Sequence, residues 1–267
     1  MTTIAAENYR APAPVIHRIP LTRITQVELR KMLDTRSGFW LMASIAITAL
    51  LATGAVILWA PNQEITYSTF VSAIGFPMAV LLPLVALLSV TGEWSQRSGL
   101  TTFTLVPHRH RIVTAKAISS VVVGVVSVLL AFAIGALGNL LAASVTSASL
   151  VWNVTLTEFL LFLLGSVLGL LIGFMLGILI RASAAAVAAY FVYSFLLPTI
   201  FLILATNQAW FKDLRPWVDV TFAQGPLLAL DGSLTGEQWA NIAVTGVIWM
   251  VIPLAVGLGF VTRAEVK

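Results

Sequence analysis

The sequence predicts an all-α integral membrane protein with six transmembrane helices and both termini in the cytoplasm. Three observations lead to this prediction. The chain of 267 residues is 59% hydrophobic but only 10% charged, whereas soluble domains carry about 25% charged residues. It contains six apolar runs, each close to the roughly 20 residues that a helix needs to cross a bilayer. Its Lys and Arg residues are concentrated on one side of these runs, as they are on the cytoplasmic side of membrane proteins.

The N-terminal part predicts a tail followed by an amphipathic helix. Residues 1–20 are interrupted by prolines, which oppose helix formation, and are expected to form a cytoplasmic tail. Residues 21–37, which include Lys31, follow a helical pattern in which Arg23, Arg30 and Asp34 fall in one narrow sector. Leu21 and Met32 lie opposite this sector. Such a helix can lie in the headgroup layer with its basic face toward anionic lipid. The alternative is a solvated helix that simply leads into the first span.

A transmembrane domain is expected over residues 38–262. The apolar runs lie at residues 38–60, 70–90, 117–143, 158–180, 183–205 and 240–261. Only a continuous helix satisfies its own backbone hydrogen bonds in lipid, so each run is predicted to be helical. Pro77, Pro83, Pro198 and Pro253 lie inside these runs and are expected to kink their helices.

The distribution of positive charge gives the orientation. Of the 15 Lys and Arg residues, all but Lys212 and Arg215 fall on one side of the predicted spans. That side is predicted to be cytoplasmic, which places residues 263–267 in the cytoplasm and requires an even number of spans. We therefore expect a multi-pass protein of the cell membrane. The net charge of +4 follows from this topology and does not indicate nucleic-acid binding.

Helix-start chemistry supports several boundaries. Thr155 with Glu158, and Thr235 with Gln238, form capping-box patterns immediately before apolar runs. Glu158 is therefore interpreted as a helix-start residue rather than as a buried functional acid. Ser183 is expected to cap the fifth span, leaving almost no loop between spans four and five.

The fourth span carries a packing pattern. Gly165, Gly169, Gly173 and Gly177 recur every four residues and form a ridge without side chains. Another helix can approach closely along such a ridge. We favour a contact within the bundle over an interface between subunits.

The outer segment, residues 206–239, mixes aromatic residues with prolines and glycines. This composition predicts short helices that lie at the outer interface or dip partly into it. An ordinary loop anchored by its aromatic residues is an equally good interpretation.

The sequence lacks the residues that several kinds of chemistry need. No ionisable residue lies well inside a predicted span, although coupled carriers usually place such groups there. There is no phosphate-binding loop motif, so ATP is not expected to bind in that way. His108 and His110 lie in a basic segment without a third ligand nearby, so no metal site is predicted. We expect no cofactor and no enzymatic activity on this chain, and any uphill transport would draw its energy from another polypeptide.

One polar stretch, residues 91–116, lies on the basic side between the second and third spans. Glu93 and Arg97 stand one helical turn apart and can form an ion pair. A short apolar patch follows the helix break at Ser98. The predicted docking residues of this stretch, beyond Glu93 and Arg97, are Gly99, Leu100, Thr101, Thr102, Phe103, Thr104, Leu105 and Val106. Such a patch suits docking to a partner protein, although it could instead fold back onto the membrane surface.

This loop resembles that of a permease subunit of the type-2 ABC (ATP-binding cassette) exporters. The most specific part is the pattern Glu93, Arg97, Pro107, Arg109 and Lys116. In this family such loops read acidic–x–Arg, then Gly-Thr-like residues, then Pro-x-Arg, then Ala-Lys entering the third span. The amphipathic helix, the six spans and the helical outer segment are also similar, so the resemblance covers nearly the whole chain.

The chain departs mildly from the family pattern, because Ser98 and the Gly99–Leu100 step replace a Thr-centred version. The resemblance implies two permease subunits, identical or different, around a central pathway, with two ATPase subunits that bind ATP and Mg²⁺. Residues 99–106 would be the coupling helix and residues 21–36 the elbow helix. The cargo would be amphipathic or hydrophobic. The alternatives are a membrane scaffold or sensor that recruits an ATPase without transport, and a polytopic membrane enzyme.

Overall fold

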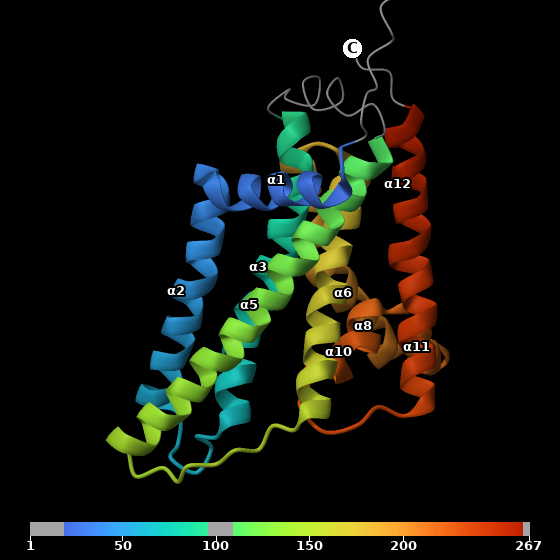
Figure 1. The fold of residues 1–267 in the computed structure, drawn as a ribbon. Helices are drawn as coiled ribbons and strands as arrows, with labels where there is room; N and C mark the ends of the chain where they lie inside the picture. The colour runs from blue at the N-terminus through green and yellow to red at the C-terminus, as the bar shows by residue number, and fades with distance from the viewer. Residues whose placement is uncertain (1–18, 96–108, 264–267) are drawn as a thin grey trace, which may run out of the picture.

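The computed structural model describes residues 19–95 and 109–263, and over these residues it is entirely helical. Six helical stretches are long and apolar enough to cross a membrane. They lie side by side, while α1 runs across one end of the bundle (Figure 1). The described chain is therefore a multi-pass, all-α membrane protein, and the predicted number of spans is confirmed.

The elements follow one another with short connections. Their bounds are α1 (Leu21–Asp34), α2 (Arg36–Trp59), α3 (Tyr67–Ser95), α5 (Arg109–Val145), α6 (Leu156–Ile180), α7 (Ser183–Phe191), η1 (Val192–Leu196), α8 (Leu197–Asn207), α9 (Ala209–Val218), α10 (Val220–Leu228), α11 (Gly236–Gly246), η2 (Val247–Val251) and α12 (Ile252–Arg263). Span five consists of α7, η1 and α8, and span six consists of α11, η2 and α12.

The outward faces of the spans are apolar. On α2, Leu51, Leu58 and Trp59 are more than half exposed, with Trp59 at 77%. A soluble protein rarely leaves a contiguous apolar surface of this kind in water. The exposed faces therefore suit a lipid environment or another apolar protein surface.

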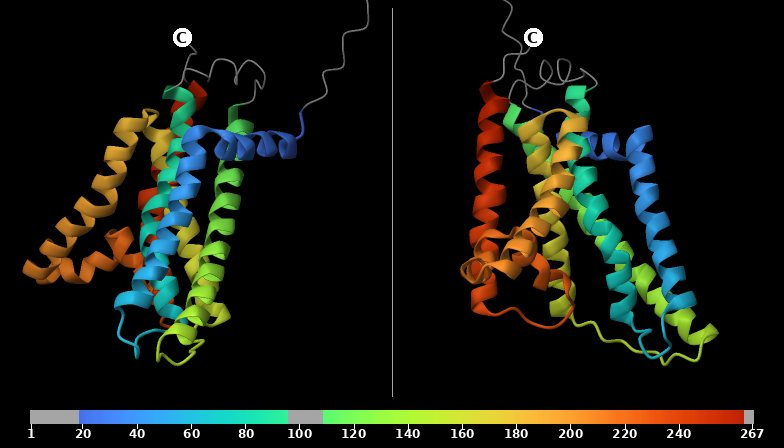
Figure 2. Two further views of the ribbon diagram at one scale, coloured as in Figure 1. Left: turned by 90° about the vertical axis from the view of Figure 1, so that its left-hand side faces the viewer. Right: turned by 180° about the vertical axis from the view of Figure 1, so that it is seen from behind.

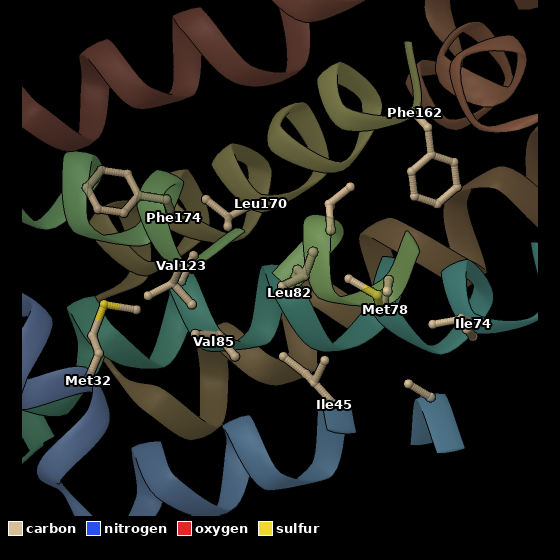
Figure 3. Close-up of a cluster of buried hydrophobic side chains, with 14 of the residues drawn as sticks. Met32, Ile45, Ile74, Met78, Leu82, Val85, Val123, Phe162, Leu170 and Phe174 are labelled. Carbon is tan, nitrogen blue, oxygen red and sulfur yellow. The ribbon is translucent and has the colours of Figure 1, made fainter. Parts of the chain in front are cut away.

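The main core lies between α2, α3, α5 and α6, with α1 closing one end. Met32 of α1, Ile45 of α2 and Val123 of α5 converge with residues of α3 and α6 in this core (Figure 3). Met78 and Leu82 occupy its centre and are almost fully buried. The core thus joins the first four spans and α1 into one packed unit.

Two helix starts agree with the sequence prediction and one differs. Thr155 and Glu158 form a capping box at α6, and Thr235 and Gln238 form one at α11. The prediction that Ser183 caps α7 is wrong: the N-cap is Ala182, which supplies no side-chain hydrogen bond. The Ser183 hydroxyl instead donates to Oγ1 of Thr91 on α3, at 2.9 Å. The side chain thus joins two helices, which satisfies its hydroxyl away from the helix end.

The third span begins earlier than the hydrophobic pattern indicated. The sequence placed residues up to Lys116 in a loop, whereas α5 begins at Arg109. Polar residues can extend a helix beyond the apolar run when tertiary contacts hold them, because propensity is a weak constraint. The structure describes α3 up to Ser95 and α5 from Arg109, so both helices extend into the predicted stretch 91–116.

Spans five and six each contain a π-helical turn before a proline. η1 precedes Pro198, and η2 precedes Pro253. Proline lacks the N–H that would complete the regular ladder, and π-turns are a recognised cause of helix irregularity. The irregularity expected at these prolines therefore takes the same form in both spans.

The predicted outer segment forms two short helices, α9 and α10. Helix α8 runs away from the bundle, and α9 turns back toward it (Figure 2). Both short helices lie level with the lower part of α3 and α5 rather than beyond their ends (Figure 2). The side chain of Asp219, between them, caps α10 by accepting a hydrogen bond from the Phe222 N–H at 3.1 Å. This arrangement matches the short-helix alternative rather than the plain loop.

Candidate functional site

Most of the predicted docking residues lie outside the described part of the chain. These are Arg97, Gly99, Leu100, Thr101, Thr102, Phe103, Thr104, Leu105 and Val106. Glu93 belongs to the last turn of α3. The structure does describe what surrounds this connection: the end of α3, the start of α5 and the whole of α1.

Helix α1 has one buried face and one exposed face. Ile24, Glu28 and Met32 recur every four residues and are buried. Arg23 and Arg30 are exposed on the other side of the helix. The predicted amphipathic pattern is therefore present, but α1 does not merely lead into the first span, because its buried face packs against α5.

The centre of that contact is a buried ion-pair cluster. The Glu28 carboxylate lies 2.5 Å from the Lys116 Nζ of α5 and 2.7 Å from the Lys31 Nζ of α1. The side chains of Glu28 and Lys116 are only 4% and 6% exposed, whereas that of Lys31 is 41% exposed. Lys116 also donates to the carbonyl oxygen of Ser89 on α3, at 3.2 Å. One ammonium group therefore joins three helices.

The cluster is electrostatically balanced. Burial alone would raise the pKa of the Glu28 carboxyl, because a low-dielectric surrounding disfavours the charged form. Attraction to Lys116, together with hydrogen bonds from Lys116 and Lys31, outweighs this effect and leaves the pKa below its ordinary value of 4.5. Glu28 is thus held in its ionised form, which keeps the pair with Lys116 intact at neutral pH.

Two further hydrogen bonds fasten α1 to the first turns of α5. The Arg111 guanidinium donates to the carbonyl oxygen of Ile19 at 2.6 Å. The Ser119 hydroxyl lies 3.1 Å from the carbonyl oxygen of Thr25 and also donates to its own helix. Together with Lys116, these contacts recur along the part of α5 that directly follows residues 96–108.

The glycine ridge of α6 lies against α3 at two positions. A Cβ atom on Gly173 would stand 2.1 Å from the Pro83 carbonyl oxygen, and one on Gly177 would stand 2.9 Å from that of Leu87. No side chain fits in the first gap, so only glycine permits this approach. The fourth and second spans are therefore in backbone contact within one chain.

The other two ridge glycines have different surroundings. A Cβ on Gly165 would meet Leu227 and Leu228 of α10 at 2.9 Å, whereas one on Gly169 would find Pro83 Cγ only at 4.0 Å. The ridge predicted as one continuous surface thus contacts α3 at one end and α10 at the other. Gly169, between them, has no atom in close contact.

The proline in α3 that meets this ridge also explains a contact with span five. Pro83 has no N–H, so the carbonyl oxygen of Ala79, four residues earlier, loses its partner in the helix. The Tyr190 hydroxyl of α7 donates to that oxygen at 3.1 Å. A buried side chain thereby compensates the missing backbone bond and holds span five against α3.

Glu28 was not among the site residues predicted from the sequence, and Lys116 was predicted to lie in a loop. A signal for Glu28 was present, because it lies in the apolar sector of α1 together with Ile24 and Met32. A carboxylate inside an apolar stripe requires a buried cation. The cation that it meets lies 88 positions further along the chain, and helical periodicity carries no information about that partner.

No family model matches the chain, and no curated protein matches it.

Proposed function

We propose that this chain is the transmembrane permease subunit of an ABC exporter, powered by separate ATPase subunits. In this proposal the α1 end of the bundle faces the cytoplasm, α1 is the elbow helix, and residues 91–116 contact the ATPase. The loop pattern described above supports the assignment. The cargo would be amphipathic or hydrophobic, and a second permease subunit would complete the pathway.

The observation that carries the proposal is the buried ion-pair cluster that joins α1 to α5, which we call the α1–α5 clamp. Glu28, Lys116 and Ser89 connect α1, α5 and α3, and the latter two helices flank the proposed docking connection. A loop passes a movement on to the rest of a protein when the helices on either side of it are fixed to a common element. Such a buried, hydrogen-bonded pair is costly to break from one side. We therefore expect the α1 end of the bundle to move as one rigid unit.

The test is co-purification of tagged protein in mild detergent, followed by mass spectrometry. Wild type is expected to bring down an ATPase, whereas Phe103→Asp is expected to bring down none while still inserting in the membrane. Leu150→Asp is a matched control, because Leu150 is an exposed apolar residue in the connection at the other end of the bundle. Phe103→Asp should also abolish transport and ATP hydrolysis coupled to it.

Three outcomes separate the proposal from its alternatives. A wild-type protein that purifies alone, or an ATPase that binds Phe103→Asp as well as wild type, contradicts docking at this loop. An ATPase that binds wild type without any transport indicates the scaffold or sensor role instead.

A further inference from the structure

A cavity of about 320 Å³ lies within one copy of the chain, between α3, α6, η1 and α10. Its lining includes Met78 and Pro83 from the middle of α3, and Gly169 from the middle of α6. These positions lie well inside the candidate spans. The volume is at the lower end of the range for small-molecule sites. The cavity is separate from the α1–α5 clamp, and nothing in its geometry depends on a second subunit.

The lining combines apolar surface with neutral polar groups. Among the described residues that form it, none carries a formal charge. The neutral polar side chains are Ser166, Tyr190, Tyr193, Ser194, Thr221 and Gln224. Because a charged group would be desolvated there without a counter-ion, the lining suits a neutral molecule. A mixed lining of this kind binds an apolar body and fixes its orientation through a few polar contacts.

Tyr193 supplies the observation that points to a ligand. Its side chain lines the cavity and is 9% exposed, and its hydroxyl has no hydrogen-bond partner among the described residues. Burying a hydroxyl without a partner is costly, so such groups call for a specific explanation. The neighbouring Tyr190 shows the normal situation, because its hydroxyl donates to Ala79.

The Tyr193 ring is held in place from its other side. It packs edge-on against the Trp249 indole, with ring centroids 5.5 Å apart. The indole N–H in turn donates to the carbonyl oxygen of Val218 at 2.7 Å. The end of α9 therefore holds Trp249, and Trp249 in turn supports the Tyr193 ring.

We propose that this cavity binds a neutral amphipathic molecule whose hydrogen-bond acceptor, a hydroxyl, ether or carbonyl oxygen, pairs with the Tyr193 hydroxyl. The apolar part of the molecule lies against Met78 and Pro83. The site belongs to a single chain and does not rest on the proposed transport function. Such a molecule could be a small compound or part of a membrane lipid, since both present the same chemistry.

The test uses 3-azioctanol, a neutral photoreactive alcohol that is small enough for the cavity. Purified protein in detergent is irradiated with increasing probe, and labelled residues are identified by mass spectrometry, with and without excess octanol. Saturable, octanol-sensitive labelling of residues lining the cavity is expected. Tyr193→Phe should weaken it roughly five-fold, because one neutral hydrogen bond is lost while the ring is kept.

Two variants make the test specific. Tyr67→Phe is the matched control: it removes a tyrosine hydroxyl that donates to Phe132 outside the cavity, so the saturation midpoint should stay near that of wild type. Gly169→Leu should abolish saturable labelling, because a Cβ there has open space toward the cavity and the larger side chain fills it. Each variant is first shown to elute as a single species.

The results decide the proposal as follows. If the cavity held only water, labelling would be non-saturable and spread over the lipid-facing surface. That result would overturn the proposed binding site. Saturable labelling that Tyr193→Phe leaves unchanged also overturns it. Repeating the titration in phosphatidylcholine nanodiscs identifies the source: competition by the bilayer indicates a lipid ligand, and undiminished labelling indicates a small molecule.

Discussion

Spans two to four and spans five and six are held in very different ways. In α6, half of an 18-residue apolar stretch is buried, and the buried share of such a stretch is 44% in α3 and in α5. The buried share is only 11% in span five and 17% in span six. The first group shares one core and a backbone contact at Gly173. Each span of the second group is interrupted by a π-turn. This group contacts α3 and α6 through a smaller core that includes Tyr190 and Tyr193, and α12 approaches the α6 backbone closely at Gly257.

The difference shows how one bundle can combine a well-buried core with two spans whose surface is mostly exposed. Tight packing and a buried ion pair make α1, α3, α5 and α6 costly to separate. Spans five and six present most of their apolar surface outward, where lipid or a second subunit can cover it. If the comparison is correct, substitutions in the first group should cost more stability than equivalent substitutions in the second. The substitution that removes the buried carboxylate of α1 should have the greatest effect.

Glu28→Ala is expected to lower the free energy of unfolding by about 3 kcal/mol, because it leaves the Lys116 ammonium buried without its partner. Thermal unfolding in detergent, followed by tryptophan fluorescence, measures this. Asp34→Ala on the exposed face of α1 is the control and should be near neutral. The double variant Glu28→Leu with Lys116→Met should recover much of the loss, and a double variant as unstable as Glu28→Ala would argue against a buried pair.

Gly173→Ala is expected to destabilise the protein by about 2 kcal/mol, because its Cβ would collide with the Pro83 carbonyl and push α3 away from α6. Gly169→Ala is the matched control on the same ridge and should be neutral or slightly stabilising, since it meets no close atom and favours helix. The two unfolding temperatures are compared directly. Equal effects would mean that the helices do not approach as closely as described.

Tyr190→Phe should cost about 1 kcal/mol, because it leaves the Ala79 carbonyl oxygen without a donor. The effect should appear in span five first, as faster hydrogen exchange of the backbone around η1. Tyr193→Phe removes a hydroxyl that has no partner in the described structure and should cost nothing. If Tyr193→Phe lowered the free energy of unfolding more than Tyr190→Phe, the hydroxyl with a hydrogen-bond partner would be that of Tyr193 instead of Tyr190.

Lowering the pH should weaken the α1–α5 contact, but by less than the substitutions above destabilise the protein. The pKa of Glu28 is lowered in the folded protein, so the native state binds this proton less readily than the unfolded state does. The stabilisation is therefore complete above the ordinary value of 4.5 and is lost as the pH falls below it. The difference in unfolding temperature between wild type and Glu28→Gln should shrink over that range. A difference that stays constant down to pH 3 would contradict an ionised Glu28.

The all-α class, the six spans and two of the helix starts could be predicted from the amino-acid sequence alone. These follow from the length of apolar runs, from the need of backbone groups for hydrogen bonds in lipid, and from the local reach of a capping box such as Thr155 with Glu158. All of them are set within a few residues of chain. The docking loop at Phe103 remains a prediction from the resemblance.

The contacts between separate elements follow from how the helices pack in three dimensions. This packing pairs Glu28 with Lys116, places Pro83 against Gly173, and brings Tyr190 to the carbonyl that Pro83 leaves without a donor. Each of these contacts joins residues far apart in the chain, and each depends on how whole helices cross. Local periodicity specifies the face of a helix but not its neighbour, so the clamp and the cavity at Tyr193 became visible only once the helices were packed.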